Sequence, residues 1–239
     1  MATIAVATTK GGAGKTRTVY NLAGTFCADG YRVMVVDADP RKRAARNVRL
    51  FNKRMIDQKR DLPEIAVDDL STVKTEAEVM RLISGYASDY DVVLIDLAGS
   101  ANQLMLVAMG RADLVIIPVQ SSADDIDGVT ETMPSVESAC GMTGRDIPVR
   151  LLFTRTQPGF QTKLSRKVRE NLTAAGYEVF GPEFINRTVI HEQTWNGFMP
   201  TIEEPNGTAA ENVRAIYNEV VKVLTGSQVG AGQKETTNV

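Results

Sequence analysis

Short apolar runs alternate along the chain with longer stretches in which apolar residues recur every three to four positions. We expect strands near residues 3–8, 32–37, 64–67, 91–96, 114–119, 149–154 and 184–185. Helices are expected near residues 15–28, 40–56, 73–87, 101–110, 124–140, 160–175 and 208–224. Strands that are continuously apolar and separated by helices predict an α/β fold. Its sheet should be doubly wound and mostly parallel, with helices on both faces.

Length and composition favour one domain. The chain has 239 residues, 43% of them hydrophobic, which is enough for one sizeable core. We expect a single domain over residues 1–225 and a disordered tail over 226–239, where apolar residues are scarce. No apolar run approaches the length of a transmembrane helix, and Met1 leads directly into a strand rather than a signal peptide. With only Cys27 and Cys140, a disulfide framework is excluded, and we expect a cytoplasmic protein.

The strongest chemical signal is a glycine-rich loop between the first strand and the first helix. Residues 10–16 read Lys10-Gly11-Gly12-Ala13-Gly14-Lys15-Thr16. Such a loop wraps backbone N–H groups around phosphate oxygens, and the following helix directs its positive dipole end at the same anion. Lys15 should reach the β- and γ-phosphates, and the Thr16 hydroxyl should bind Mg²⁺. The ordinary pattern has glycine where this chain has Thr9, and it lacks the extra Lys10. The alternative is a glycine-rich turn that binds nothing.

Carboxylates follow two of the predicted strands. Asp37 and Asp39 come after the second apolar run, and Asp96 ends the run over residues 92–95. Ligands in open parallel sheets bind at the carboxyl ends of the strands, so these acids should lie beside the loop. One of the first pair would hold Mg²⁺ through water, the other would orient the attacking water, and Asp96 would be the Walker B carboxylate. For Asp37 and Asp39 the alternative is an Asx turn that caps the next helix, and for Asp96 it is a buried strand end.

Together these motifs resemble those of the ParA/MinD superfamily of deviant Walker ATPases, which are P-loop NTPases. The resemblance rests on residues 10–16, 37–40, 95–100 and 114–119, and within the superfamily the chain is similar to the small plasmid-partition ParA proteins. It implies a sandwich homodimer with ATP and Mg²⁺, weak ATPase activity and non-specific DNA binding by the dimer. It also implies a ParB/ParG-like centromere-binding partner that stimulates hydrolysis, and a nucleoid-associated location.

The same resemblance assigns roles to individual residues. Lys10 would reach across the dimer to the partner's nucleotide, and Asp39 would hold the catalytic water. Asp125 would lie near the dimer face, and Arg155 and Arg187 around the adenine and the dimer edge. Two residues depart from the family pattern: Arg17 stands where a hydroxyl usually contacts the α-phosphate, and Arg41 stands where Gln is usual. Both place a cation near the nucleotide or the dimer face.

Basic residues are clustered although the formal net charge is only −2. One cluster spans residues 41–54 and the other 163–169, and local basic patches on a nearly neutral protein can bind a polyanion. Late basic residues are where the resemblance places DNA, so the first candidates are Lys163, Arg166, Lys167 and Arg214. A solvated helix face is the alternative for both clusters. His191, the one histidine, is expected at the surface or at a helix start.

Other members of the superfamily are distinguished by features outside the phosphate loop. A MinD-like membrane ATPase needs an amphipathic helix at its end, which residues 228–239 do not provide, and an iron–sulfur relative needs paired cysteines. Positioning ATPases for chemoreceptor arrays, microcompartments or T-DNA transfer share the same motifs and stay open as alternatives. So does a nucleotide-dependent switch that hydrolyses ATP slowly.

Overall fold

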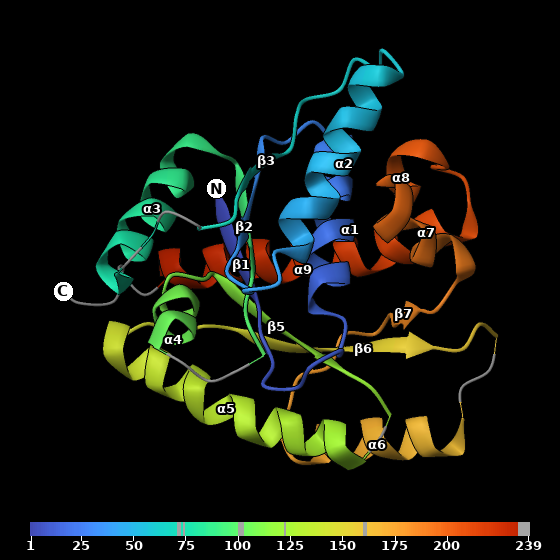
Figure 1. Ribbon diagram of the computed structural model, residues 1–239. Helices are drawn as coiled ribbons and strands as arrows, with labels where there is room; N and C mark the ends of the chain where they lie inside the picture. Colours follow the sequence, from blue (N-terminus) through green and yellow to red (C-terminus); the bar gives the residue numbers. More distant parts are fainter. Residues whose placement is uncertain (71–72, 74, 100–102, 122, 160–161, 234–239) are drawn as a thin grey trace.

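A single parallel sheet forms the centre of the protein in the computed structural model (Figure 1). The structure describes residues 1–239 except 71–72, 74, 100–102, 122, 160–161 and 234–239, and it does not describe the side chains of 123–125 and 227–233. The strands are β1 (Ala2–Val6), β2 (Val33–Asp37), β3 (Ala66–Asp68), β4 (Val92–Asp96), β5 (Leu114–Val119), β6 (Val149–Thr156) and β7 (Phe184–Ile185). Their spatial order is β3-β2-β4-β1-β5-β6-β7, and every described pairing of these strands is parallel. The predicted α/β class is confirmed, with a sheet that is parallel throughout its described part.

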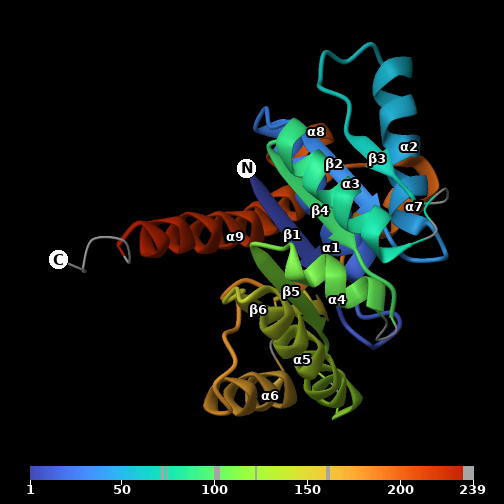
Figure 2. The same cartoon turned by 90° about the vertical axis from the view of Figure 1, so that its left-hand side faces the viewer.

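Helices cover both faces of this sheet, as the doubly wound prediction requires. One face packs against α1 (Lys15–Ala28), α2 (Arg43–Asp57), α7 (Thr188–Asn196), α8 (Pro200–Glu203) and α9 (Thr208–Gln233). The other packs against α3 (Glu76–Asp89), α4 (Gln103–Gly110), α5 (Ala123–Thr143) and α6 (Lys163–Ala174). Figure 1 shows the two groups on either side of the strands, and Figure 2 shows α9 extending beyond the body of the domain.

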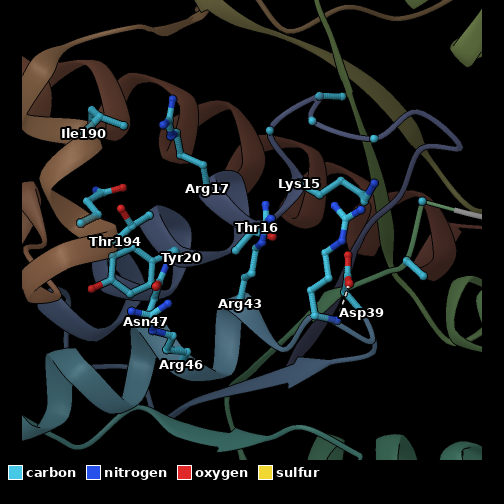
Figure 3. A pocket seen from close by; sticks show the side chains of 18 of the residues that line it. Lys15, Thr16, Arg17, Tyr20, Asp39, Arg43, Arg46, Asn47, Ile190 and Thr194 are labelled. Atoms are coloured by element: carbon cyan, nitrogen blue, oxygen red, sulfur yellow. Dashed lines mark hydrogen bonds between the residues drawn. The ribbon is translucent and has the colours of Figure 1, made fainter.

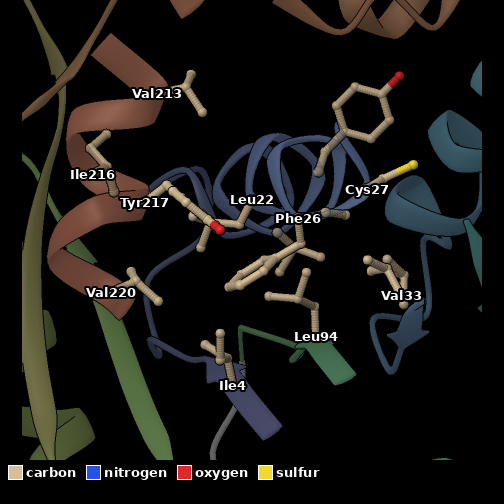
Figure 4. Packing of buried hydrophobic residues seen from close by; sticks show 14 of the residues in the cluster. Ile4, Leu22, Phe26, Cys27, Val33, Leu94, Val213, Ile216, Tyr217 and Val220 are labelled. Atoms are coloured by element: carbon tan, nitrogen blue, oxygen red, sulfur yellow. The ribbon is translucent and has the colours of Figure 1, made fainter. Parts of the chain in front are cut away.

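The core on the first face is built around α1. Leu22 and Phe26 project from it towards Ile4 and Leu94 of the sheet, while α9 closes the cluster from the side (Figure 4). Phe26 meets the ring of Tyr217 edge to face, with 4.8 Å between the ring centroids. Because α1 is buried against both the sheet and α9, the phosphate loop at its start is attached to a rigid element.

The structure differs from the predicted elements in two additional helices and one helix end. Helices α7 and α8 were not predicted as elements, although a helix start was expected near His191. Helix α9 runs to Gln233 rather than ending near residue 224, so the predicted tail begins inside this helix. Short helices such as α8 carry too few periodic positions to be recognised from sequence. None of the helices in the described part of the chain is long and apolar enough to cross a bilayer.

The sheet brings the predicted acids together at one edge. Asp96 is the register neighbour of both Val6 and Asp37, so the ends of β1, β2 and β4 lie side by side. The loop after β1 leaves the sheet at this same edge and leads into α1. The carboxyl edge of the sheet therefore holds the candidate site.

Candidate functional site

The glycine-rich loop adopts a conformation that ordinary residues resist. Gly12 and Gly14 have φ angles of 80° and 108°, in the left-handed region that favours glycine. A Cβ on Gly14 would lie 3.3 Å from the side chain of Thr154, whose hydroxyl donates to the Ala13 carbonyl at 2.7 Å. The loop backbone therefore requires glycine at positions 12 and 14, and β6 packs against the loop through Thr154.

Lys15 is folded back under the loop. Its Nζ donates to the carbonyls of Thr8 and Lys10, each at 3.2 Å, and the residue is only 7% exposed. Burial lowers the pKa of Lys15 below its usual value, while Asp96 and Asp39 act in the opposite direction. A buried ammonium with only carbonyl partners among the described residues is suited to receive an anion.

Thr16 and Asp96 meet as the motif predicts. The Thr16 hydroxyl donates to Asp96 Oδ2 at 2.7 Å, and Asp96 is fully buried. Its second oxygen, Oδ1, is buried and makes no hydrogen bond within the described structure. Burial, reinforced by Asp37, raises the pKa of Asp96 to about 7 although the Thr16 hydrogen bond opposes this. A hydroxyl beside a carboxylate with an unsatisfied oxygen fits the oxygen ligands that Mg²⁺ prefers.

Asp37 and Asp39 play different structural parts. Asp37 is fully buried, and its two oxygens accept the backbone N–H groups of Asp39 at 3.1 Å and Ala45 at 2.9 Å. Burial raises the pKa of Asp37, while these hydrogen bonds act against the rise. Asp37 therefore holds the turn into α2, and its contribution at Mg²⁺ stays a prediction. Asp39 is half-buried, accepts the Arg41 backbone N–H at 2.8 Å and lines the pocket.

A pocket of about 670 Å³ opens over the phosphate loop. Figure 3 shows its walls: Thr16, Arg17 and Tyr20 come from α1, Arg43, Arg46 and Asn47 from α2, and Ile190 and Thr194 from α7. The loop, Asp39, Pro40, Arg41, Ala98, Gly99, Arg155 and Gln193 complete the lining. The pocket is large enough to hold a nucleotide.

Arg17 and Arg155 lie in this pocket without an acidic partner. Arg155 has a φ of 58° at the irregularity of β6, and its Nη2 lies 3.9 Å from where a Cβ on Gly12 would stand. Burial lowers the pKa of Arg17, and the nearby Arg155 lowers it further. Neither side chain makes a hydrogen bond or an ion pair with any other described residue. Strained backbone that brings like charges together is typical of a site built for an anion.

Three other residues were predicted near the nucleotide or the dimer face, and none of their roles is tested by the contacts that the structure describes. Arg187 precedes α7, does not line the pocket, and its buried Nε makes no hydrogen bond in the described part of the chain. Asp125 lies in the first turn of α5, and its side chain is outside the described residues. Lys10 lies against Gly128 of α5, with its Cβ 3.4 Å from where a Cβ on Gly128 would stand. The roles of these three residues stay predictions.

The four candidate DNA residues do not share one surface. Lys163, Arg166 and Lys167 are exposed on α6, which covers the second face of the sheet. Arg214 lies on α9, which covers the first face, and it pairs with Asp29 at 2.9 Å. The four candidates therefore lie on two surfaces, with three of them side by side on α6, and their contact with DNA stays a prediction.

Several pocket residues were not predicted as part of the site. Tyr20 lies one helical turn beyond Thr16, with its hydroxyl buried and unpartnered among the described residues. Ile190, Gln193 and Thr194 share one face of α7, a helix that the sequence signalled only weakly. Arg43 and Arg46 had been noticed only as members of a basic segment. His191 is exposed and hydrogen-bonds Asn186 at 2.9 Å, as expected of a residue at a helix start.

Comparison with known proteins finds ATPases of similar sequence. The sequence profile of the family described as ATPase MipZ matches residues 2–139. Protein ParA of Rhizobium radiobacter is 27% identical over 229 residues, which cover 94% of this chain and 98% of that protein. The chromosome-partitioning ATPase Soj of Thermus thermophilus is 28% identical over 239 residues, covering 91% of this chain and 94% of that protein.

A solved structure shares the fold at lower identity. Cobyrinic acid a,c-diamide synthase of Mycobacterium smegmatis, with bound ATP analogue and magnesium, superimposes with a TM-score of 0.68. The two are 23% identical, and the match covers 93% of this chain and 94% of that one. At this identity the likeness shows the fold alone.

Proposed function

Because the chain belongs to the MipZ family of ATPases, in the ParA/MinD group, we propose that it binds ATP with Mg²⁺ and hydrolyses it. The observation that carries this proposal is the Thr16–Asp96 pair beneath the phosphate loop, with one oxygen of Asp96 buried and unsatisfied. An ATPase site needs both a phosphate-binding loop and metal-binding oxygens, and the Thr16–Asp96 pair beside the glycine-rich loop supports the proposal that this site provides both.

The residues of the loop and its neighbours can be assigned roles in binding the nucleotide and the metal ion. The backbone N–H groups of residues 11–16 would surround the phosphates, and Lys15 would exchange its carbonyl partners for the β- and γ-phosphate oxygens. Thr16 and Asp96 would hold Mg²⁺, with Asp37 fixing the neighbouring turn. When bound, the metal ion would neutralise charge that develops on the phosphates. Asp39, half-buried at the pocket wall, would orient the attacking water.

The proposal extends to an ATP-dependent dimer. Lys10 stands at the start of the loop, and in the dimer it would contact the nucleotide of the second copy. Dimerisation would juxtapose two copies of the α6 surface of Lys163, Arg166 and Lys167, so DNA binding without sequence preference would depend on ATP. A ParB/ParG-like partner would stimulate hydrolysis and release the dimer, and the cycle would segregate a plasmid or chromosome on the nucleoid.

The test combines nucleotide, DNA and three variants. The parent should sediment as a dimer with ATP but not ADP, and should retain non-specific DNA only as a dimer. Lys15→Ala should lose nucleotide binding, whereas Lys10→Ala should bind ATP and stay monomeric. Asp39→Ala should bind ATP, dimerise and persist as a dimer, because the dimer dissociates only after ATP is hydrolysed.

The outcomes separate this function from its competitors. If the protein hydrolyses ATP and dimerises but does not retain DNA, the proposed DNA binding is wrong, and a positioning ATPase for another cargo becomes the better proposal. Dimerisation with single-turnover hydrolysis too slow to dissolve the dimer, with and without DNA, would favour the slow nucleotide-dependent switch. A Lys10→Ala chain that still dimerises with ATP would remove the role of Lys10 across the interface.

A further inference from the structure

Two helices at the carboxyl edge of the sheet carry opposite charge. Helix α2 contains five Lys or Arg residues and one acid, Asp57. Every charged residue of α5 is acidic. Both helices begin within a few residues of a strand end, α2 after β2 and α5 after β5, so both start at the edge that carries the phosphate loop.

The two helices stand diagonally across β1. In the sheet order β2-β4-β1-β5, α2 starts on one side of β1 and α5 on the other. They also cover opposite faces, since Val48 and Phe51 of α2 belong to the first core cluster and Val129 and Val136 of α5 to the second. Figures 1 and 2 agree in placing α2 and α5 on opposite sides of the sheet.

The unpaired charge of α2 is concentrated at its start. Arg43 and Arg46 are exposed, line the pocket, and make no side-chain hydrogen bond or ion pair with another described residue. Further along the same helix, Arg49 pairs with Asp69 at 2.8 Å and Arg54 pairs with Glu203 at 2.8 Å. The chain therefore neutralises the distal arginines of α2 and leaves those nearest the phosphate loop available to another molecule.

The acidic face of α5 lies on the far side of the same loop. Asp127 and Glu131 are exposed and one helical turn apart. Glu131 Oε2 accepts the Thr9 hydroxyl at 3.0 Å, and Thr132 Oγ1 accepts the Thr9 backbone N–H at 3.1 Å. These bonds fix the acidic face against the loop.

Twofold symmetry turns this diagonal arrangement into a self-complementary one. An axis perpendicular to the strands, lying across the phosphate-loop edge at right angles to the line from α2 to α5, brings the carboxyl edges of two copies face to face and exchanges the positions of α2 and α5. It therefore brings α2 of one copy opposite α5 of the other, twice in each dimer.

We propose that the occupant of the basic start of α2 is the acidic face of α5 in a second copy of this chain, with Arg43 and Arg46 facing the partner's Asp127 and Glu131. This inference rests on the proposed ATP-dependent dimer and adds the residues that select its geometry. Complementary charge of this kind steers association and fixes register, and it weakens as salt rises.

The test is a pair of charge-reversed chains. Arg43→Glu/Arg46→Glu makes the proposed contact residues of both helices acidic, and Asp127→Lys/Glu131→Lys makes the contact residues of both helices basic. Each chain alone would then repel its own copy, and its dimer dissociation constant with a non-hydrolysable ATP analogue should rise by about tenfold or more. An equimolar mixture should form heterodimers with near-parental affinity, because both α2–α5 contacts are again between opposite charges. Differently labelled chains and sedimentation in low and high salt measure this directly.

The controls distinguish a failure of the α2–α5 pairing from a failure of the proposed dimer. Lys53→Glu and Glu137→Lys change charge on the same helices farther from the loop, and they should dimerise like the parent. Because Arg43 and Arg46 line the pocket, ATP affinity is measured for each chain, and the single changes Arg46→Glu and Glu131→Lys repeat the design if the double variant loses nucleotide. A parent that never dimerises would overturn the proposed function. Variants that dimerise like the parent, or a mixture that does not recover, would overturn this pairing alone. Unchanged dimerisation with lost DNA retention would assign the α2 surface to DNA instead.

Discussion

The two ends of the sheet differ in whether their charged side chains are paired. At the amino edge, Asp91 pairs with Arg32 at 2.8 Å and Asp113 pairs with Arg145 at 2.7 Å, and Arg150 pairs with Glu178. At the carboxyl edge, Asp96 is buried with an unsatisfied oxygen, and Arg17 and Arg155 lie near each other. Folding alone favours paired charge, because a buried polar group without a partner costs free energy. The carboxyl edge therefore lowers the stability of the empty protein in a way that a bound nucleotide and metal ion would compensate.

The largest effects should follow from neutralising Asp96. Asp96→Asn removes a proposed metal-binding oxygen, and Mg²⁺-dependent hydrolysis should fall by at least about 100-fold. The same change should stabilise the empty protein at pH 8. The pKa of Asp96 is about 7 when folded against an ordinary value of 3.8, so its ionisation opposes folding by up to about 4 kcal/mol. This penalty is absent below pH 4 and grows as the pH rises towards 7.

Thermal unfolding of both proteins from pH 4 to pH 8, without nucleotide, measures the stability effect. The two Tm values should coincide at the acid end and separate as the pH rises, with the variant higher. A variant that is less stable than the parent at pH 8, or that hydrolyses ATP at the parental rate, would remove Asp96 from the proposed role.

The second largest effect should come from the loop backbone. Gly14→Ala forces a side chain onto a φ of 108° and to within 3.3 Å of Thr154. We expect a loss of about 1–3 kcal/mol in the free energy of unfolding, with ATP affinity reduced more than tenfold because the loop must move. Gly11→Ala is the matched control for the unfolding measurement, since a Cβ there meets nothing within 4 Å. Equal effects of the two changes in urea unfolding, or a parental ATP affinity of Gly14→Ala, would contradict this explanation.

A smaller effect is expected from the arginine that replaces the usual hydroxyl. Arg17→Thr should weaken ATP binding by about 10- to 100-fold, the range expected for one charge-assisted hydrogen bond to phosphate. Removing one of two like charges should also slightly stabilise the empty protein. Arg145→Thr at the amino edge should leave ATP affinity unchanged. If Arg17→Thr binds ATP as tightly as the parent, Arg17 points away from the phosphates in the bound state.

These comparisons show which parts of the site could be predicted from sequence. The phosphate loop and the acids at the ends of β2 and β4 are local patterns, because each depends on neighbours in the chain and on strand direction. Asp37 illustrates the limit: its spacing was compatible with a magnesium ligand or with an Asx turn, and only the folded chain shows the turn, through the hydrogen bonds from the N–H groups of Asp39 and Ala45.

The rest of the site depends on distant packing. Arg155 lies close to Gly12 where β6 is irregular between Thr154 and Thr156. No local sequence pattern predicted this irregularity. The pocket wall from α7 depends on a short helix whose periodicity is brief. Arg214 and the basic residues of α6 lie on opposite faces of the sheet. Their positions in the sequence do not reveal which face each helix covers.

The smallest effect should come from the amino edge, where Asp91→Asn provides the counterpart of Asp96→Asn. Arg32 donates from its side chain and its backbone to Asp91, and these hydrogen bonds lower the pKa of Asp91 to about 2. The sign is opposite to that at Asp96: the ionised carboxylate adds stability above pH 4, and this contribution is lost as the pH falls through 2. Asp91 and Arg32 are exposed, so water and salt screen the pair, and the variant should lose no more than a few degrees in Tm at pH 7. The loss should shrink in high salt and vanish at the acid end of the titration, while ATP affinity stays parental. A Tm that rises at pH 8, as expected for Asp96→Asn, would mean that the two edges do not differ in the way their charges are paired.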